Sequence, residues 1–239
     1  EPGEGKIELT IESSVIHQYG RQIRKVTLET LERLGVDSAK VTIFDKGALD
    51  CTLKARVECA VYRSNGITEN LPWGGHPIMH PNKKRLRRSM MFLNCQKPGL
   101  IKDPYIYKPD SIMLDLEDAV AENQKDAARY SLYHALQEID YRGVERVVRI
   151  NGLDTPHWKE DIRVCVAGGA DTIRIAKTET AQDVKIVEEH VLAAEREFGR
   201  PEGSTLLMAA LESCKGVLNA LEVCQSSDRL IGIALSGGD

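Results

Sequence analysis

The sequence has few aromatic residues and no long apolar run. Phe, Trp and Tyr make up 5% of the 239 residues, although the hydrophobic share of 42% and the charged share of 28% are ordinary. No apolar stretch approaches the roughly 18 residues that a membrane-spanning helix needs. The first residues, EPGEGKIELT, lack the basic and apolar regions of a signal peptide. We therefore expect a soluble globular protein without a membrane segment.

The chain also lacks a strong net charge and paired cysteines. A formal net charge of −4 gives no bulk reason to expect binding to nucleic acid or to a membrane surface. No two of the six cysteines form a C-x-x-C pair. We interpret the cysteines as reduced core thiols and expect a cytoplasmic protein.

The first 62 residues predict a small α+β unit. Apolar and polar residues alternate over 7–11, which is typical of a half-buried strand, and apolar residues recur at helical spacing over 16–34. Gly35 is placed to end that helix, and KVTIF predicts a second strand. DKG then predicts a hairpin turn, and strict apolar alternation over 49–61 predicts a long antiparallel strand with one buried face.

Residues 63–86 are rich in Gly, Pro and Asn and have no periodicity, so we expect a linker there. His76 and His80 lie four residues apart in this segment. Their spacing is compatible with metal binding, but on a Pro-containing loop we interpret them as solvated side chains. The basic run KKRLRR is short, and we interpret it as a solvated segment rather than a nucleic-acid site.

From residue 87 onward, short apolar strands alternate with longer helical patterns. The expected strands are SMMFL, SIMLDL, RVVRI, DTIRIA, TLLMAAL and LIGIAL. Helices are expected over 121–139, 157–168, 180–198 and 214–225. Thr180 is a good N-cap for the third of these helices, and Gly199 is placed to close it. Repeated strand–helix units predict a parallel sheet.

Polar side chains recur at the end of each expected strand, about 30 residues apart, which is the length of one strand–helix unit. They are Asp115, Glu117, Arg149, Asn151, Lys177, Glu212 and Asp239. In a (β/α)₈ barrel the carboxyl ends of the strands meet on one face, where active sites lie. In an open doubly wound sheet they would line a crevice, but the G-x-G-x-x-G fingerprint of nucleotide-binding sheets is absent from the sequence. We therefore favour the barrel.

These side chains suit metal-assisted chemistry on an acidic substrate. Two carboxylates from separate strands fit Mg²⁺, which prefers oxygen ligands and keeps positions open for water or substrate. Nearby arginines fit a substrate that bears carboxylates. The alternative is a set of salt bridges at the barrel rim that binds no ligand. SIMLDLEDAV, at 111–120, raises the same question, because three carboxylates follow a buried strand and need cations, solvent or a metal to neutralise them.

Both parts of the sequence resemble components of one enzyme. Residues 1–62, with IELTIESSVIHQYGRQIRKVTLETLERLGV and DKGALDCTLKARVE, resemble the acyl carrier (γ) subunit of citrate lyase. Residues 87–239, with RRSMMF, DSIMLDLEDAV, VVRINGLD, KTETAQDV, GRPEGSTLLMAALES and RLIGIAL, resemble its β subunit. That family consists of Mg²⁺-dependent carbon–carbon lyases with a TIM-type barrel. The resemblance implies an α/β fold: a carrier domain at 1–62, a linker at 63–86 and a (β/α)₈ lyase domain at 87–239.

The resemblance also implies roles for individual residues. Glu212 and Asp239 match the carboxylates that hold Mg²⁺ in the family. Arg88 and Arg149 match arginines that bind the carboxylate and the thioester-side oxygens of the substrate, and we expect both to be catalytic. Gly238 stands where the family has Glu, and we expect it to contact the substrate.

Three further acids match a cluster at the barrel rim, namely Asp115, Glu117 and Asp118. The resemblance implies that they organise arginines and metal-bound water rather than bind the metal themselves. Asn94 and Cys95, in FLNCQKPG, stand where the family has Pro and Gly.

In the carrier family, a serine upstream of the first strand carries a phosphoribosyl-dephospho-CoA prosthetic group. Ser14 is an alternative attachment site, but it follows the first strand, and we favour its interpretation as the N-cap of the helix that starts near residue 16. We therefore expect the attachment serine to be absent from this chain. Since a complete barrel takes about 250 residues, we also expect the barrel to be incomplete at its C-terminal end.

The leading hypothesis is a cytoplasmic citrate lyase component that cleaves a citryl thioester on an acyl carrier to oxaloacetate and an acetyl thioester. The expected partners are the citrate lyase α subunit and other β and γ subunits, in an oligomer without nucleic acid or membrane. One alternative is a malyl-CoA-type lyase, which the carrier-like half argues against. The other is a truncated, non-catalytic assembly piece of the complex.

Overall fold

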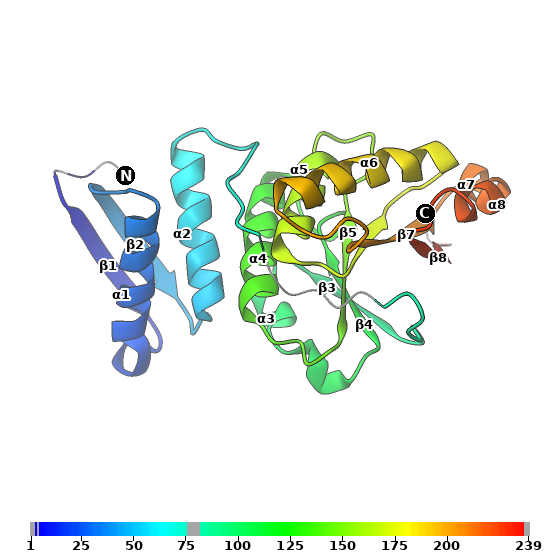
Figure 1. Ribbon diagram of the computed structural model, residues 1–239. Coiled ribbons are helices and arrows are strands. Elements are labelled where there is room, and N and C mark those ends of the chain that lie inside the picture. The colour runs from blue at the N-terminus through cyan, green and yellow to red at the C-terminus, as the bar shows by residue number, and fades with distance from the viewer. Residues whose placement is uncertain (1–2, 4, 76–81, 237–239) are drawn as a thin grey trace. The chain divides into compact units, whose positions relative to one another are not determined.

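The computed structural model describes residues 3, 5–75 and 82–236 and divides into two compact units, Glu1–Leu71 and Pro72–Asp239. The division falls inside the predicted linker. Each unit has its own sheet, of two strands in the first and six in the second (Figure 1). Within the described residues, no helix is long and apolar enough to cross a bilayer.

The first unit has the order strand, helix, strand, helix. Its elements are β1 (Ile7–Ser13), α1 (Ile16–Arg33), β2 (Ala39–Asp45) and α2 (Asp50–Ser64). β1 and β2 pair in parallel along their whole length. The core of this unit joins both helices to the sheet and consists of Ile23, Val26 and Leu53, with Ile11, Val15 and Ile43 packed against them.

The predicted antiparallel strand of this unit is a helix, α2, so the α+β prediction is corrected to a parallel β-α-β-α unit. An alternation of period two also places residues i, i+4 and i+8 on one side of a helix. Cys51, Ala55 and Cys59 form one such row, Leu53 and Val57 form another, and all five are buried. The length of 15 residues fits a helix better than a strand, which usually has about 5–6.

Asp45 ends β2 and organises the turn into α2, where the sequence predicted a hairpin. Its carboxylate accepts hydrogen bonds from the backbone N–H groups of Gly47 at 3.0 Å and Ala48 at 2.8 Å, and Ser13 Oγ donates to it at 2.6 Å. Burial raises the pKa of Asp45, but these hydrogen bonds outweigh it, so the pKa lies below its ordinary value. Gly47 has a φ of 91°, which the tight turn requires.

α1 begins at Ile16 as predicted, but Ser14 is not its N-cap. Val15 occupies that position and has no side-chain capping hydrogen bond. The backbone N–H of Ser14 instead donates to the carbonyl of Asp45 at 3.3 Å. Gly35, with a φ of 68°, follows the end of α1, which confirms the predicted stop.

The second unit contains a parallel sheet whose strands follow one another in sequence order. They are β3 (Met90–Asn94), β4 (Ser111–Asp115), β5 (Glu145–Ile150), β6 (Thr172–Ile175), β7 (Leu206–Leu211) and β8 (Leu230–Leu235). Every residue of β4, β6 and β7 is buried. The six predicted strands and their parallel pairing are therefore confirmed.

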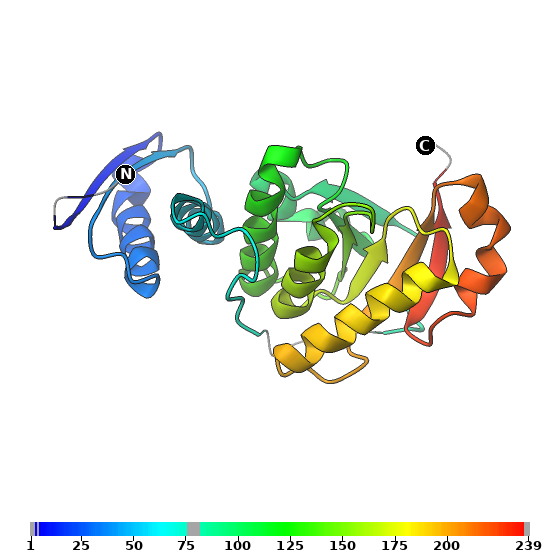
Figure 2. The ribbon, with the colours of Figure 1, turned by 90° about the horizontal axis from the view of Figure 1, so that it is seen from above.

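The helices of this unit lie between the strands in the sequence. They are α3 (Pro98–Ile101), η1 (Pro104–Tyr107), η2 (Glu122–Gln124), α4 (Lys125–Glu138), α5 (Trp158–Gly168), α6 (Ala181–Glu197), α7 (Cys214–Leu218) and α8 (Ala220–Cys224), where η marks a 3₁₀ helix. α4, α5 and α6 pack side by side outside the sheet (Figure 2). Thr180 caps α6 together with Asp183, and Gly199 follows the helix with a φ of 66°, as predicted.

All six cysteines are free thiols, but they are not all in the core. Those at 51, 59, 95 and 165 are buried, whereas Cys214 and Cys224 are exposed. The prediction of core thiols is wrong for these two. Cys214 is the first residue of the short helix α7, and Cys224 is the last residue of the short helix α8.

Candidate active site

A row of polar side chains crosses the sheet at the carboxyl ends of its strands. The pairing register places Asn94 beside Asp115, Asp115 beside Arg149, and Arg149 beside Arg174. Residues in register on neighbouring strands point to the same face of a sheet. Side chains from β3, β4, β5 and β6 therefore share one row, as the spacing of Asp115 and Arg149 predicted.

Asp115 and Arg149 form a buried, two-pronged ion pair. Arg149 donates from Nε to Oδ1 and from Nη2 to Oδ2 of Asp115, both at 2.8 Å. The same carboxylate accepts the backbone N–H groups of Glu117 at 3.0 Å and Ala119 at 3.2 Å. Burial lowers the pKa of Arg149, but the hydrogen bonds and charge of Asp115 outweigh it and hold the pKa above its ordinary value. Arg149 is therefore a fixed positive charge.

Glu117 and Asp118 are held less firmly than Asp115. Glu117 Oε2 lies 2.9 Å from Arg149 Nη1, and Oε1 lies 3.4 Å from Lys177 Nζ. Burial raises the pKa of Glu117, against the lowering effect of the Arg149 charge. The side chain of Asp118 is 59% exposed and lies 4.0 Å from Arg149 Nη1. Arginine, lysine and solvent thus neutralise the three acids that follow β4.

Glu212 follows β7 and presents one carboxylate oxygen without a partner. Its Oε2 accepts the backbone N–H of Lys177 at 3.1 Å. Lys177 has a φ of 49°, a left-handed conformation that is uncommon outside glycine and gathers at functional sites. Glu212 Oε1 is buried and has no hydrogen-bond partner among the described residues. Such an oxygen is available to a cation that prefers carboxylate ligands.

Arg174, on β6, is a site residue that the sequence analysis did not single out. Its Nη2 donates to Ser236 Oγ at 3.3 Å, and its Nε is buried without a hydrogen-bond partner among the described residues. Burial lowers the pKa of Arg174, although the charge of Glu212 acts in the opposite direction. The ring of Phe92 lies 5.5 Å from Arg149 and 5.6 Å from Arg174. The sequence did contain a signal for Arg174. RVVRI and DTIRIA both have Arg before the last Ile, so Arg174 occupies the same strand position as Arg149.

A buried network fixes the loops behind this row. Lys125 Nζ donates to Asn151 Oδ1 at 2.6 Å and to the carbonyl of Glu117 at 2.7 Å. Asn151 Nδ2 donates to Asp161 Oδ2 at 2.6 Å, and Arg129 Nε donates to the other oxygen of Asp161 at 2.7 Å. Burial lowers the pKa of Lys125. The network ties the loops after β4 and β5 to α4 and α5.

The structure does not bring Arg88 to this row. Arg88 precedes β3 and pairs with Asp110, from Nη2 to Oδ1 at 2.8 Å and from Nε to Oδ2 at 3.1 Å. This pairing holds the pKa of Asp110 well below its ordinary value. Residues before and after the strands of a parallel sheet lie at opposite ends of it. The structure therefore places Arg88 away from Arg149, and the role of Arg88 as a catalytic, substrate-binding residue stays a prediction.

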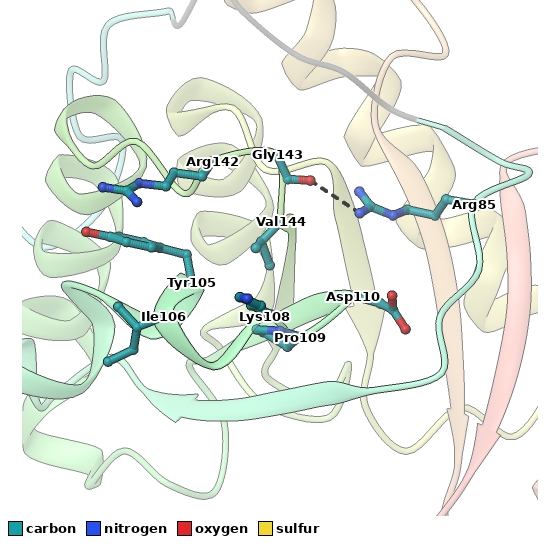
Figure 3. Close-up of a pocket in the computed structure, with 9 residues that line it drawn as sticks. All are labelled: Arg85, Tyr105, Ile106, Lys108, Pro109, Asp110, Arg142, Gly143 and Val144. Atoms are coloured by element: carbon teal, nitrogen blue, oxygen red, sulfur yellow. Dashed lines mark hydrogen bonds between the residues drawn. The ribbon is translucent and has the colours of Figure 1, made fainter.

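A pocket of about 430 Å³ lies at this opposite end, where β4 and β5 begin (Figure 3). It is lined by Arg85, Tyr105, Ile106, Lys108, Pro109, Asp110, Arg142, Gly143 and Val144. The guanidinium of Arg142 stacks 4.3 Å above the Tyr105 ring. Asp110 is already paired with Arg88, so the pocket offers no free carboxylate for a metal. We therefore place the candidate site at the carboxyl ends of the strands.

Several predicted site residues lie outside the described residues. They are Gly238, Asp239 and the two linker histidines, His76 and His80. Among residues 3, 5–75 and 82–236, no group of three or more His, Cys, Asp or Glu side chains is placed to hold a metal ion. Asp239 as a second metal ligand, and Gly238 as a substrate contact, stay predictions.

Two family models match the chain. The model described as HpcH/HpaI aldolase/citrate lyase matches residues 88–239. An ACP model, described as malonate decarboxylase delta subunit (MdcD), matches residues 1–64. These matches confirm the two resemblances, a carrier-like first part and a citrate lyase β-like second part.

Individual relatives agree with this assignment. Citrate lyase subunit beta of Leuconostoc mesenteroides subsp. cremoris is 54% identical over 158 residues, which cover 66% of this chain and 52% of that protein. The L-malyl-CoA/beta-methylmalyl-CoA lyase of Rhodobacter capsulatus is 35% identical over 162 residues, which cover 66% of this chain and 51% of that protein. The chain thus spans about half the length of the curated relatives it matches.

Among solved structures, the citrate lyase beta subunit of M. tuberculosis, complexed with oxaloacetate and magnesium, is 27% identical. The match covers 62% of this chain and 59% of that one, with a TM-score of 0.48. The family assignment rests on the family model, which covers more than half of the sequence at residues 88–239. The chain therefore belongs to the HpcH/HpaI aldolase/citrate lyase family.

Proposed function

We propose that the chain is a citrate lyase component in which residues 87–239 form a lyase domain, with a carrier-like domain at 1–62 and a linker at 63–86. The lyase domain cleaves a citryl thioester on an acyl carrier, in a Mg²⁺-dependent retro-Claisen reaction, to oxaloacetate and an acetyl thioester. We further propose that its six parallel strands belong to a (β/α)₈ TIM-type barrel. The observation that carries the proposal is the unpartnered oxygen of Glu212 at the same end of the sheet as Arg149 and Arg174.

The charge balance of the site supports an acidic substrate bound together with a divalent cation. The site contains four carboxylates and three cations, namely Asp115, Glu117, Asp118, Glu212, Arg149, Arg174 and Lys177. Asp239, the proposed second metal ligand, raises the excess to two negative charges, which a divalent cation would neutralise, so that the arginines can attract an anion. A substrate that carries several carboxylates fits this balance.

Glu212 is the residue that fits Mg²⁺ in the described structure. Its buried Oε1 is an oxygen ligand without another partner, and Asp239 is the proposed second ligand, with Gly238 beside it. When bound, Mg²⁺ supplies a Lewis acid that polarises substrate oxygens. Lys177 positions Glu212 through its backbone N–H.

The arginines act on the negative charge of the reaction. Proton removal from the citryl tertiary hydroxyl starts the cleavage, the carbon–carbon bond breaks, and the enolate of the thioester takes up a proton to become the acetyl group. Arg149, fixed by Asp115 and Glu117, holds a positive charge where negative charge gathers. Arg174 offers its free Nε–H to a substrate carboxylate. Asp115, Glu117 and Asp118 support Arg149 and Lys177 and do not bind the metal.

The test combines metal binding with turnover. We expect E212Q to weaken Mg²⁺ binding, measured by calorimetry, at least tenfold. E202Q is the matched control, because Glu202 pairs with Arg196 on the surface and should leave binding unchanged. We also expect oxaloacetate release from a citryl thioester, followed through malate dehydrogenase and NADH, only with Mg²⁺. Equal Mg²⁺ affinities for E212Q and E202Q, or no oxaloacetate in the presence of Mg²⁺, would refute the proposal.

The two alternatives have their own discriminating measurements. Identity of 54% to a citrate lyase β subunit against 35% to a malyl-CoA-type lyase, together with the carrier-like unit, favours the citryl substrate. Faster turnover of malyl than of citryl thioesters would reverse this choice. A non-catalytic assembly piece would melt at the same temperature with and without Mg²⁺, whereas a metal-binding lyase domain is stabilised by the ion.

The wider setting is part of the same proposal. We place the protein in the cytoplasm, in an oligomer with the citrate lyase α subunit and other β and γ subunits. The phosphoribosyl-dephospho-CoA group would belong to the carrier domain, but we assign no residue of this chain to its attachment and derive no step from it. Ser14 is exposed at the turn between β1 and α1, where only its backbone has an assigned role.

A further inference from the structure

Trp73, in the middle of the predicted linker, is fixed to the second unit. Its side chain is part of the core, with 7% of the residue exposed. The indole Nε1 donates to Glu160 Oε1 at 2.9 Å, and the ring lies 5.1 Å from that of Tyr130 and 4.9 Å from that of Tyr133. A buried tryptophan with a satisfied N–H and two aromatic neighbours is a strong attachment point.

The backbone beside Trp73 is held as well. Tyr133 Oη accepts the N–H of Gly74 and donates to the carbonyl of Gly74, both at 3.0 Å. A Cβ atom at Gly74 would itself come 3.0 Å from this hydroxyl, which is tighter than most Cβ contacts. One tyrosine thus satisfies both backbone groups of a linker residue.

The receiving surface is built from three neighbouring helices. Tyr130 and Tyr133 belong to α4, and Glu160 belongs to α5. Arg163 Nη1 holds the Glu160 carboxylate at 2.9 Å and 3.0 Å, and the same arginine pairs with Glu197 of α6. The acceptor for the indole is therefore fixed before the linker docks.

This attachment is connected to the candidate active site through α5. Glu160 and Asp161 are adjacent in the first turn of α5, the helix that follows the carboxyl end of β5. Glu160 binds Trp73, while Asp161 binds Asn151 in the network behind the active-site row. One helix turn therefore connects the linker attachment with the loops of the site.

We propose that Trp73 anchors the linker to the lyase domain, so that the tether of the carrier-like domain is confined to the segment between the end of α2 and Pro72. α2 ends at Ser64 and the second unit begins at Pro72, so this tether spans at most about 25 Å when fully extended. The anchor limits how far the carrier-like domain can lie from the point where the linker docks. This inference does not depend on the proposed function.

Release of Trp73 would lengthen the tether. Beyond Gly75, the next described contacts of the linker are the carbonyl of Asn82, which accepts from Arg87 Nη2 at 3.1 Å, and Lys83 Nζ, which donates to the carbonyl of Asp228 at 2.6 Å. A tether that runs to residue 82 has a root-mean-square span about 1.6-fold larger. The effective concentration of the carrier-like domain around the lyase domain would fall about fourfold.

The first experiment measures the burial of Trp73. The chain has two tryptophans, so W158F leaves Trp73 as the only indole. We expect acrylamide to quench its fluorescence several-fold less than that of free N-acetyltryptophanamide, and we expect E160A to raise the quenching. E202Q is the control for loss of a carboxylate and should leave the acrylamide quenching unchanged. Quenching equal to that of the free indole would overturn the anchor.

The second experiment measures the tether by pulsed electron spin resonance on the full chain. Spin labels on Cys214 and on Y19C, in a C224S background, report the distance between the units, because both label sites are exposed. We expect W73A to broaden the distance distribution and W73F, which keeps an aromatic ring in the same place, to broaden it less. Circular dichroism checks that each variant is folded. Identical distributions for W73A and the parent would contradict the proposal.

Neither readout depends on catalysis, so the two proposals fail separately. If acrylamide quenches Trp73 weakly but the chain does not bind Mg²⁺, the lyase function is refuted and the anchor is not.

Discussion

Replacing Arg149 with leucine should destabilise the second unit, and more at alkaline than at acidic pH. The substitution removes the two-pronged partner of Asp115, which is 2% exposed, and the nearer partner of Glu117, which is 4% exposed. Two carboxylates would then remain buried beside an apolar side chain. An uncompensated buried charge is more destabilising than the loss of an equivalent surface pair.

The expected loss is about 3 kcal/mol at pH 8, the lower end of the range for breaking a buried ion pair. The lower end applies because partial compensation stays in place. Asp115 keeps the backbone N–H groups of Glu117 and Ala119, and Glu117 keeps Lys177 Nζ at 3.4 Å. R149K keeps the charge but loses the fork that matches a carboxylate, so it should cost about 1 kcal/mol.

The pH dependence follows from Glu117. Burial already raises its pKa, and loss of the Arg149 charge removes the principal opposing effect, so the folded pKa rises further. A carboxyl with a raised folded pKa contributes stability below its unfolded value of about 4.3 and loses it as pH rises through the folded pKa. The difference in free energy of unfolding between the parent and R149L should therefore be smaller at pH 5 than at pH 8.

Urea unfolding followed by tryptophan fluorescence measures this difference in the right unit, because both tryptophans lie in Pro72–Asp239. In R149L/D115L, loss of one buried charge should restore part of the stability, giving a coupling energy of about 1–3 kcal/mol. If the free energy of unfolding of R149L is within about 1 kcal/mol of the parent's at both pH values, Asp115 and Arg149 do not form the buried interaction described above.

Two further predictions concern capping and a turn. T180A should lower the stability of the second unit by about 1 kcal/mol, since Thr180 Oγ1 accepts the Asp183 N–H at 3.3 Å; an unchanged urea midpoint would contradict this. D45A should destabilise the first unit by about 1–2 kcal/mol at neutral pH, measured by hydrogen exchange of residues 7–64. Because the pKa of Asp45 is lowered, its contribution is present above the unfolded value of about 3.9 and is lost as pH falls through the folded pKa. An equal loss at pH 2 would contradict that.

The sequence predicted the second unit well because its strands are buried on both faces. β4, β6 and β7 have no exposed residue, so their sequences are short apolar runs separated by helical patterns, which have few alternative interpretations. The cap at Thr180 and the stop at Gly199 are local effects that depend on neighbouring backbone alone. Predictions of this kind do not need the tertiary fold.

α2 was mispredicted because the alternation of its sequence permits two structures. Leu53 packs against Ile23 and Val26 of α1, and such tertiary contacts decide between a strand with one buried face and a helix with two buried rows. Length was the sequence signal that favoured the helix, since 15 residues exceed an ordinary strand. Propensity and pattern were overridden by packing at this point.

Arg88 and Arg149 were expected to share a function, but the structure places them apart. Arg88 stands before β3, whereas Arg149 lies within β5 near its carboxyl end, so the direction of the strands separates them. The role expected for Arg88 came from a resemblance and stays a prediction. Its distance from the row follows from chain direction, because the ends of parallel strands lie on opposite sides of the sheet.

The two arginines of the row differ in what they leave open for a ligand. Arg149 donates from Nε and Nη2 to Asp115, and its Nη1 lies 2.9 Å from Glu117 Oε2, so all three of its nitrogens lie beside carboxylates of the protein. Arg174 donates from Nη2 to Ser236 Oγ, and its buried Nε has no hydrogen-bond partner among the described residues. A buried guanidinium without a carboxylate is stabilised most by an incoming anion. Arg149 is thus suited to fix the charge of the site, and Arg174 to receive the substrate.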